Sequence, residues 1–142
     1  MEGVMDRPRD FTRDECLGLM DTVSIGRVVF TEQALPAVMP VAFVIDDGDA
    51  VICVPSESNL SAVTRGAIVA FEVDALDAAA PAGWAITVIG RARVDRDPGE
   101  RVRQALQAWA TGPQTEFIRI SCQRLAGRRI WPSHIGDDHA AA

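Results

Sequence analysis

Runs of apolar and β-branched residues, separated by short polar turns, predict that this chain folds mainly as β-strands. We expect strands over residues 23–30, 36–45, 50–54, 67–73, 84–94 and 116–124, and residues 127–131 favour a short seventh. Gly26 interrupts the first of these strands, and a glycine there often marks a bend or a close backbone approach. Pro40 cannot donate to a ladder, so it is expected at an edge or a bulge.

Helix signals occur in three places between the strands. Thr12 and Glu15 have the spacing of a capping box, which predicts a short helix through Met20 with Cys16 and Leu19 on the same face. A second short helix is expected over residues 60–65.

The third helix is expected to begin at Asp97 as N-cap, with Pro98 in its first turn, and to run to about residue 109. Its predicted buried stripe consists of Val102, Leu106 and Trp109.

Turn signals indicate that most strands are joined as hairpins. The run Asp46-Asp47-Gly48-Asp49 lies between two apolar segments, and residues 32–35 form a second turn. Because strands and helices do not alternate in a βαβ rhythm, the pattern predicts a six- or seven-stranded antiparallel barrel with short helices. A length of 142 residues favours one domain over residues 1–142, with flexible tails at 1–11 and 135–142.

The net charge and the composition limit which ligands and partners the chain is expected to bind. The net charge of −6 disfavours nucleic acid, although it leaves room for one anionic ligand in a local basic pocket. All 14 lysine and arginine positions are arginine, so the chain has no lysine that could form a Schiff base. It also has no tyrosine, so no phenol can act as an acid. The acidic N-terminus lacks the pattern of a signal peptide, and no apolar run reaches membrane-spanning length, so a cytoplasmic protein without a membrane partner is expected.

The side chains that most often carry chemistry point to no catalytic residue and no metal site. The three cysteines are far apart, which argues against disulfides and structural zinc, and Cys53 is predicted to be packed in a strand. His134 and His139 fall in the predicted C-terminal tail. The hairpin acids 46–49 lack the later glutamate of an EF-hand.

Two groups of side chains leave alternatives open. Trp84, Trp109 and Trp131 are either packing residues or a wall beside a planar ligand. Arg91 and Arg93 share one face of a strand, which is either a solvated surface or the wall of an anion site.

The order of several segments resembles the FMN-binding split barrel of the pyridoxamine 5'-phosphate oxidase-like proteins, most closely the small branch of nitroimidazole-reductase-like flavoproteins. The similarity covers most of residues 12–131. Its parts are Ser24-Ile25-Gly26-Arg27-Val28, Pro40-Val41-Ala42-Phe43-Val44, Val69-Ala70-Phe71-Glu72-Val73-Asp74, the strand after Gly83-Trp84, Ile118-Arg119-Ile120 and Gly127-Arg128-Arg129-Ile130.

This resemblance implies a homodimer with FMN bound across its interface. It places the flavin ring against Pro40, Val41, Ala42 and Phe43, with Trp84 beside it. The phosphate would lie at the loop and helix start that contain Ser56, Ser58, Asn59 and Leu60. The family's arginine and lysine in this region are replaced by Cys53 and Asn59, and Glu57 adds an acid.

The resemblance favours a flavin-dependent oxidoreductase whose chemistry is carried by the cofactor. Two alternatives follow from the altered phosphate segment. One is a binding or regulatory split-barrel protein that has lost FMN, and the other uses a different cofactor such as F420.

Overall fold

The computed structural model describes residues 10–56, 58, 60, 65–77, 82–110 and 114–130. The strands are β1 (Asp10–Phe11), β2 (Ile25–Glu32), β3 (Leu35–Asp46), β4 (Asp49–Pro55), β5 (Ile68–Asp77), β6 (Ala82–Val94), β7 (Thr115–Ser121) and β8 (Arg124–Ile130). The helices are α2 (Arg13–Met20), α4 (Glu100–Ala105) and a 3-10 turn, η2 (Gln107–Trp109).

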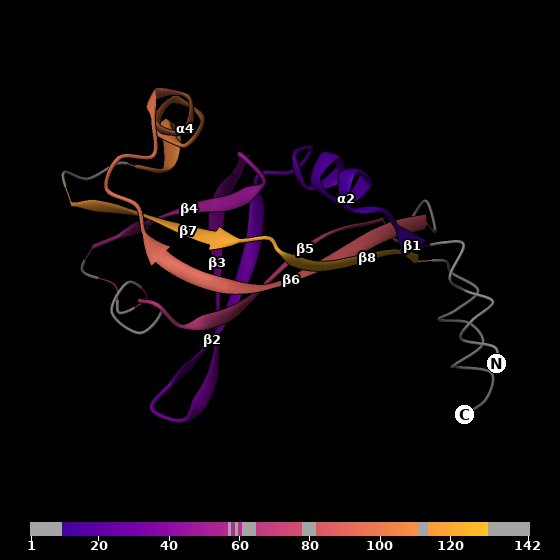
Figure 1. Cartoon of the computed structure of the whole chain (residues 1–142), viewed down its shortest axis with the longest axis horizontal. Helices are drawn as coiled ribbons and strands as arrows, with labels where there is room; N and C mark the ends of the chain where they lie inside the picture. Colours follow the sequence, from indigo (N-terminus) through magenta and orange to yellow (C-terminus); the bar gives the residue numbers. More distant parts are fainter. Residues whose placement is uncertain are drawn as a thin grey trace.

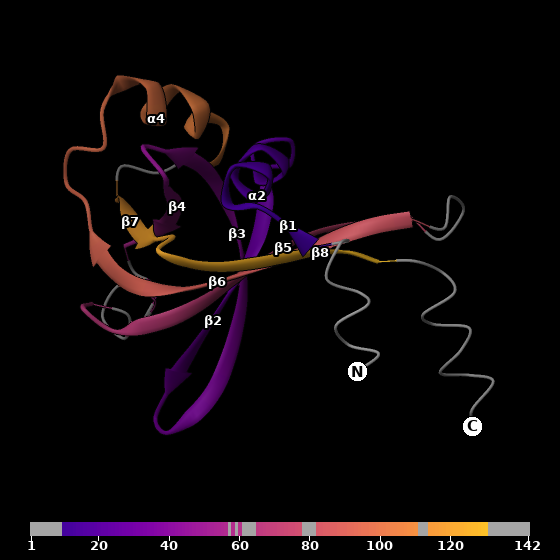
Figure 2. The same cartoon turned by 45° about the vertical axis from the view of Figure 1, so that its right-hand side comes forward.

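Six antiparallel strands close into a barrel in the order β6–β5–β2–β3–β4–β7, with β7 pairing back to β6. The predicted mainly-β split barrel is therefore confirmed. Strand β8 pairs with the first half of β6, and together with β5 and β1 it forms an arm that extends away from the barrel (Figure 1). Helix α4 covers the outside of the barrel, whereas α2 lies near the root of the arm (Figure 2).

Strand β6 belongs to both parts of the molecule, and Gly90 is where it changes partner. Residues 83–89 of β6 pair with β8, and residues 92–94 pair with β7. At Gly90 the chain passes so close to the end of β7 that an added Cβ would lie 1.8 Å from the Ser121 carbonyl oxygen. A side chain at this position is thus excluded by backbone atoms.

Both predicted turns are confirmed. Gln33 and Ala34 have φ of 54° and 66°, and Asp47 and Gly48 have φ of 52° and 77°. Positive φ at both central residues is the type I′ geometry that matches the twist of hairpin strands. The two turns join β2 to β3 and β3 to β4.

The capping box of α2 is also confirmed. The Thr12 hydroxyl accepts a hydrogen bond from the Glu15 backbone N–H at 3.2 Å, and the Glu15 carboxylate accepts one from the Thr12 N–H at 2.8 Å. Cys16 and Met20 are buried against the barrel.

The third helix differs from its prediction at both ends. It begins at Glu100 and not at Asp97, because Gly99 has φ of 98° and the Asp97 N–H donates to Asp95 in a local turn. It then tightens into η2, which turns Trp109 out of the buried stripe and leaves it 53% exposed.

The strand predicted over residues 116–124 covers nearly all of β7 and the first residue of β8, with a break between them. The carbonyl of Cys122 accepts from the Arg13 guanidinium of α2 and does not continue the ladder, so β7 ends at Ser121 and β8 begins at Arg124. The connection between the strands predicted over residues 67–73 and 84–94 is likewise shorter than predicted, because β5 continues to Asp77 and β6 begins at Ala82.

The last two residues of the N-terminal tail expected over 1–11 form a strand. Asp10 and Phe11 form β1 and pair with Arg128 and Gly127, and the Arg129 guanidinium lies 5.2 Å from the Phe11 ring centroid. Residues 1–9, 61–64 and 131–142 lie outside the described residues, and so do most of the predicted second helix and the C-terminal tail.

Two apolar clusters hold the barrel. The inner cluster fills the barrel and contains Phe43 and Phe71, whose rings meet edge to face with centroids 5.0 Å apart. The outer cluster lies between the sheet and α4, and its members are Ala42, Val51, Cys53, Val102, Leu106 and Phe117.

Candidate functional site

The predicted ring-binding strand divides its side chains between three environments. Val41 and Phe43 belong to the inner cluster, Ala42 to the outer cluster beneath α4, and Pro40 is exposed. Alternation along a strand makes this division unavoidable. These four side chains therefore do not converge on one surface, and a ligand on this strand would meet mainly its backbone.

The backbone of β3 is available along one edge. Strand β4 pairs with β3 only from Ala42 onward, so residues 35–41 have β2 on one side and no described strand on the other. Pro40 lies in this stretch, which confirms its predicted edge position. The Phe43 N–H points toward the β2 side and donates to the Ser24 carbonyl, so the even-numbered residues face the free edge.

That edge accepts hydrogen bonds more readily than it donates them. Of the even-numbered residues that face it, Pro36 and Pro40 have no N–H, so Val38 supplies the one donor among these three. The arrangement suits a ligand that presents donors, such as an imide N–H, to backbone carbonyls.

The predicted phosphate loop follows β4. Ser56 is tied to the neighbouring chain: its N–H donates to the Gln114 carbonyl at 2.8 Å, and its hydroxyl lies 3.4 Å from the Gln114 side-chain oxygen. The Ser58 N–H donates to the Pro55 carbonyl at 3.0 Å. Leu60 is buried in the inner cluster, so it anchors the loop. Asn59 and Glu57 are outside the described residues.

Two buried polar atoms at this end of the barrel lack a hydrogen-bond partner in the described structure. They are the Ser58 hydroxyl and one carboxylate oxygen of Glu116, which lies opposite Val54 in the β4–β7 pair. Burying such groups unpaired is costly. The hydroxyl is suited to donate to a ligand, whereas the Glu116 carboxylate disfavours a phosphate nearby.

Cys53 lies in the apolar cluster beneath α4 and is 8% exposed. Burial raises the pKa of its thiol, so the side chain is protonated at neutral pH. Its prediction as a packed residue is confirmed. Its side chain packs with Val102 of α4 and with Leu106, which follows that helix. The comparison of this position with a phosphate-binding arginine of the family stays a prediction.

Trp84 lies apart from the β3 strand. It pairs with Ala75 of β5 and Arg129 of β8, and its half-buried indole packs against the inner cluster. The row of paired residues from Pro40 runs through Arg27 and Glu72 to Thr87, about three strand spacings or roughly 14 Å. Trp84 is three residues beyond Thr87, so within one chain these predicted site residues are not brought together.

A charged cluster occupies the middle of this row on the outer surface of the sheet. Arg27 donates to Glu72 at 2.9 Å and to Asp74 at 3.3 Å. Partial burial and the adjacent Asp74 carboxyl raise the pKa of Glu72. The exposed Arg91 and Arg93 lie farther along β6, as a solvated face predicts, and Arg91 donates to the Gly66 carbonyl.

A buried arginine that the sequence pattern did not single out fixes the opposite end of the barrel. Arg119 of β7 donates to Asp95 at 2.8 Å, to Asp46 at 3.0 Å and to Asp49 at 3.4 Å. Hydrogen bonds from Arg101 and then from Arg119 lower the pKa of Asp46. The pKa of Asp95 is also lowered, because the hydrogen bond from Arg119 acts against the opposing effect of burial. Asp46 and Asp49 of the predicted hairpin therefore bind a buried arginine. Arg101 of α4 also donates to Asp46 at 2.9 Å.

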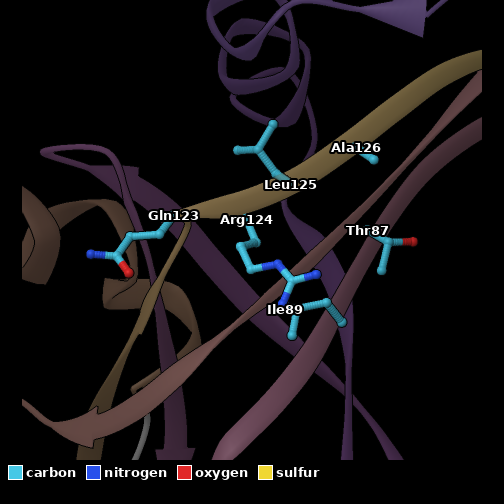
Figure 3. Close-up of a pocket in the computed structure, with 6 residues that line it drawn as sticks. All are labelled: Thr87, Ile89, Gln123, Arg124, Leu125 and Ala126. Atoms are coloured by element: carbon cyan, nitrogen blue, oxygen red, sulfur yellow. The ribbon is translucent and has the colours of Figure 1, made fainter.

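An open pocket of about 410 Å³ lies between β6 and β8 and is lined by Thr87, Ile89, Gln123, Arg124, Leu125 and Ala126 (Figure 3). The described residues contain no group of three side chains able to hold a metal ion, and His134 and His139 lie outside them. Within the same residues, no helix is long and apolar enough to cross a membrane.

Comparison with known proteins identifies the family. Residues 12–129 match the family model described as pyridoxamine 5'-phosphate oxidase, which spans most of the chain. The chain belongs to this family. Membership of the pyridoxamine 5'-phosphate oxidase family confirms the expected resemblance, whereas the narrower nitroimidazole-reductase-like branch stays a prediction.

Individual relatives agree with the family. An uncharacterized protein of Mycobacterium tuberculosis is 33% identical over 128 residues, which are 85% of this chain and 84% of that protein. An FAD-binding protein of Mycobacterium smegmatis is 25% identical with a TM-score of 0.68, covering 86% of this chain and 97% of its own. An FAD- and haem-binding protein of the same organism shares the fold, with a TM-score of 0.71 at 18% identity, over 94% of this chain and 80% of its own.

Proposed function

We propose that this chain is a flavin-binding oxidoreductase that works as a homodimer. The observation that carries the proposal is the free, acceptor-rich edge of β3 in a chain whose family and solved relatives include flavin-binding proteins. A flavin supplies hydride and electron transfer when it is bound. The residues of the chain then hold and orient the ring, and none of the described side chains is assigned as acid or base.

The residues of the free edge fit the ring better than the loop fits a phosphate. Backbone carbonyls at Pro36, Val38 and Pro40 face the edge and can accept from an imide N–H. Ser58 offers an unpaired hydroxyl, but the described part of the loop presents no cation and Glu116 adds a carboxylate. A loop with these groups binds a terminal phosphate weakly. The loop therefore favours a flavin nucleotide whose affinity depends on more than a terminal phosphate.

FAD is therefore proposed ahead of FMN, and the FAD-binding relative at 25% identity supports this order. Titration of the purified chain with FAD, FMN, riboflavin and F420, followed by flavin fluorescence and the visible spectrum, tests the proposal. We expect FAD to bind most tightly and the bound flavin to be reducible. Absence of binding by all four compounds would refute it.

Replacement of Ser58 by alanine separates ligand binding from stability. Because the hydroxyl is buried without a partner, Ser58→Ala should leave the thermal midpoint unchanged or raise it. If the hydroxyl donates to the nucleotide, affinity should fall about tenfold, corresponding to about 1.4 kcal/mol. Ser24→Ala is the control, because Ser24 is exposed and contributes only its backbone carbonyl to Phe43. Equal affinities for the two variants would exclude this role of Ser58.

A second candidate is a binding or regulatory protein of this fold that carries no flavin. It is favoured by the packing of Cys53 beneath α4, which leaves no side chain at that position to meet a phosphate. The same titration distinguishes the two candidates. The second candidate predicts a colourless protein that binds none of the four compounds, so the fluorescence and the visible spectrum of each compound stay unchanged.

A further inference from the structure

The pocket between β6 and β8 is separate from the β3 residues predicted to hold a flavin ring. The strand register places Ile89 opposite Arg124 and Thr87 opposite Ala126, so each strand contributes two residues that face outward. Thr87 is about three strand spacings from Pro40 on the same outer surface. A ligand in this pocket would therefore lie apart from a flavin ring on β3 of the same chain.

Arg124 is the charged residue of the pocket. Figure 3 shows its side chain reaching from β8 across Ile89 toward Thr87. Among the described residues it has no hydrogen-bonding or ion-pairing partner, whereas Arg27, Arg101 and Arg119 are all paired with carboxylates. An unpaired guanidinium presents a planar fork of N–H donors that matches a carboxylate or phosphate.

The charges around the pocket also favour an anion. Arg91 and Arg93 follow Ile89 on the outward side of β6, and both are exposed. Glu72 lies opposite Thr87, but its carboxylate accepts from Arg27 at 2.9 Å on the side away from the pocket. In a chain of net charge −6, this end of the sheet is locally basic.

We propose that this pocket binds the anionic group, a carboxylate or a phosphate, of a small ligand whose apolar body lies on Ile89 and Ala126. Arg124 makes the forked contact, and Thr87 and Gln123 line the two ends of the pocket on either side of it. The proposal does not rest on flavin binding, because a free substrate anion and the phosphate of a nucleotide offer the same chemistry.

Two matched pairs of probes distinguish these sources: benzoate against benzamide, and FMN against riboflavin. Calorimetric titration of the full chain should show that the anionic member binds more tightly in at least one pair. Arg124→Met should weaken the anion by about tenfold or more and leave its neutral counterpart unchanged. Arg124→Lys, which retains the charge but not the fork, should give an intermediate affinity.

Arg128→Met is the matched control, because Arg128 is exposed on the same surface of β8 but lies outside the pocket. A preference for benzoate assigns the pocket to a substrate anion, and a preference for FMN assigns it to the cofactor phosphate. The proposal is overturned if neither anion is preferred, if the preference survives in Arg124→Met, or if Arg128→Met abolishes it equally. Should no flavin bind at all, the benzoate pair still decides this question separately from the proposed function.

Discussion

At the scale of single residues, Gly90 has the strictest steric requirement among the residues discussed. It sits where β6 leaves β8 for β7, and the atom that excludes a side chain is a backbone carbonyl oxygen of Ser121. A backbone atom in a paired strand cannot rotate away as a flexible side chain does. The requirement therefore reflects the closure of the barrel and not local flexibility.

Gly90→Ala is expected to lower the free energy of unfolding by about 3 kcal/mol or more, because the barrel must open slightly to admit the methyl group. Gly18→Ala is the control: Gly18 lies in α2 with nothing within 4 Å of an added Cβ. That change should raise stability by about 0.5–1 kcal/mol through helix propensity. Urea denaturation of both variants measures the contrast, and equal effects would disprove the steric argument.

At the scale of elements, the Arg119 cluster ties together three segments that are distant in the sequence. Its carboxylates come from the β3–β4 hairpin and from the chain after β6, and the arginine comes from β7. With a side chain only 9% exposed, Arg119 depends on these partners for its solvation. The cluster thus connects these three segments at one end of the barrel.

Removal of the arginine should expose this dependence. Arg119→Met leaves Asp46, Asp49 and Asp95 facing one another, and the expected loss of stability is about 3 kcal/mol. Arg101→Met, which removes an arginine that is 61% exposed and contacts the same Asp46, should cost less than about 1 kcal/mol. Thermal or urea unfolding distinguishes the two, and similar losses would contradict a buried role for Arg119.

Acidification provides an independent test of the same cluster. The folded pKa values of Asp46 and Asp95 are lowered, so their stabilising contribution is present above the unfolded pKa of about 3.9 and is lost as the pH falls through the folded values. The wild-type chain should therefore lose stability below about pH 4. In Arg119→Met this acid-dependent loss should shrink, as unfolding midpoints between pH 3 and pH 7 would reveal.

The sequence predicted those elements that depend on neighbouring residues. It did not predict the features that depend on contacts between residues distant in the sequence. Strands, both hairpin turns and the α2 cap follow from alternation, turn residues and a four-residue motif. The break at Cys122 depends on Arg13 of α2, and the role of Arg119 depends on three separate acids. Alternation along β3 could have warned that Val41 and Ala42 face opposite sides, so that a list of four consecutive site residues would not share one surface.

At the scale of the whole molecule, exposed apolar side chains lie on the outward surface of the sheet. They are Ile25, Val38, Ile68 and Leu76, with exposures of 39%, 62%, 58% and 59%. The strand register places all of them on the same side of their strands. An exposed apolar surface is typical of an interface, which supports the proposed homodimer.

A charge on this surface should weaken self-association. We expect Val38→Glu to shift the chain toward monomer in light scattering at micromolar concentration, because it places a carboxylate on the outward surface of β3. Leu35→Glu is matched in exposure, at 67%, but lies on the other side of the same strand, at the turn. It should leave the dimer intact. A wild-type chain that is already monomeric would refute the dimer directly.

The free edge of β3 has a consequence for handling the protein. An exposed strand edge is a template on which another chain can add a strand, and such edges promote aggregation. Here Pro36 and Pro40 remove two of the three edge-facing donors at positions 36, 38 and 40, so a foreign strand could form only an incomplete ladder. The same two prolines that leave carbonyls open to a ligand therefore help to keep the ligand-free chain in solution.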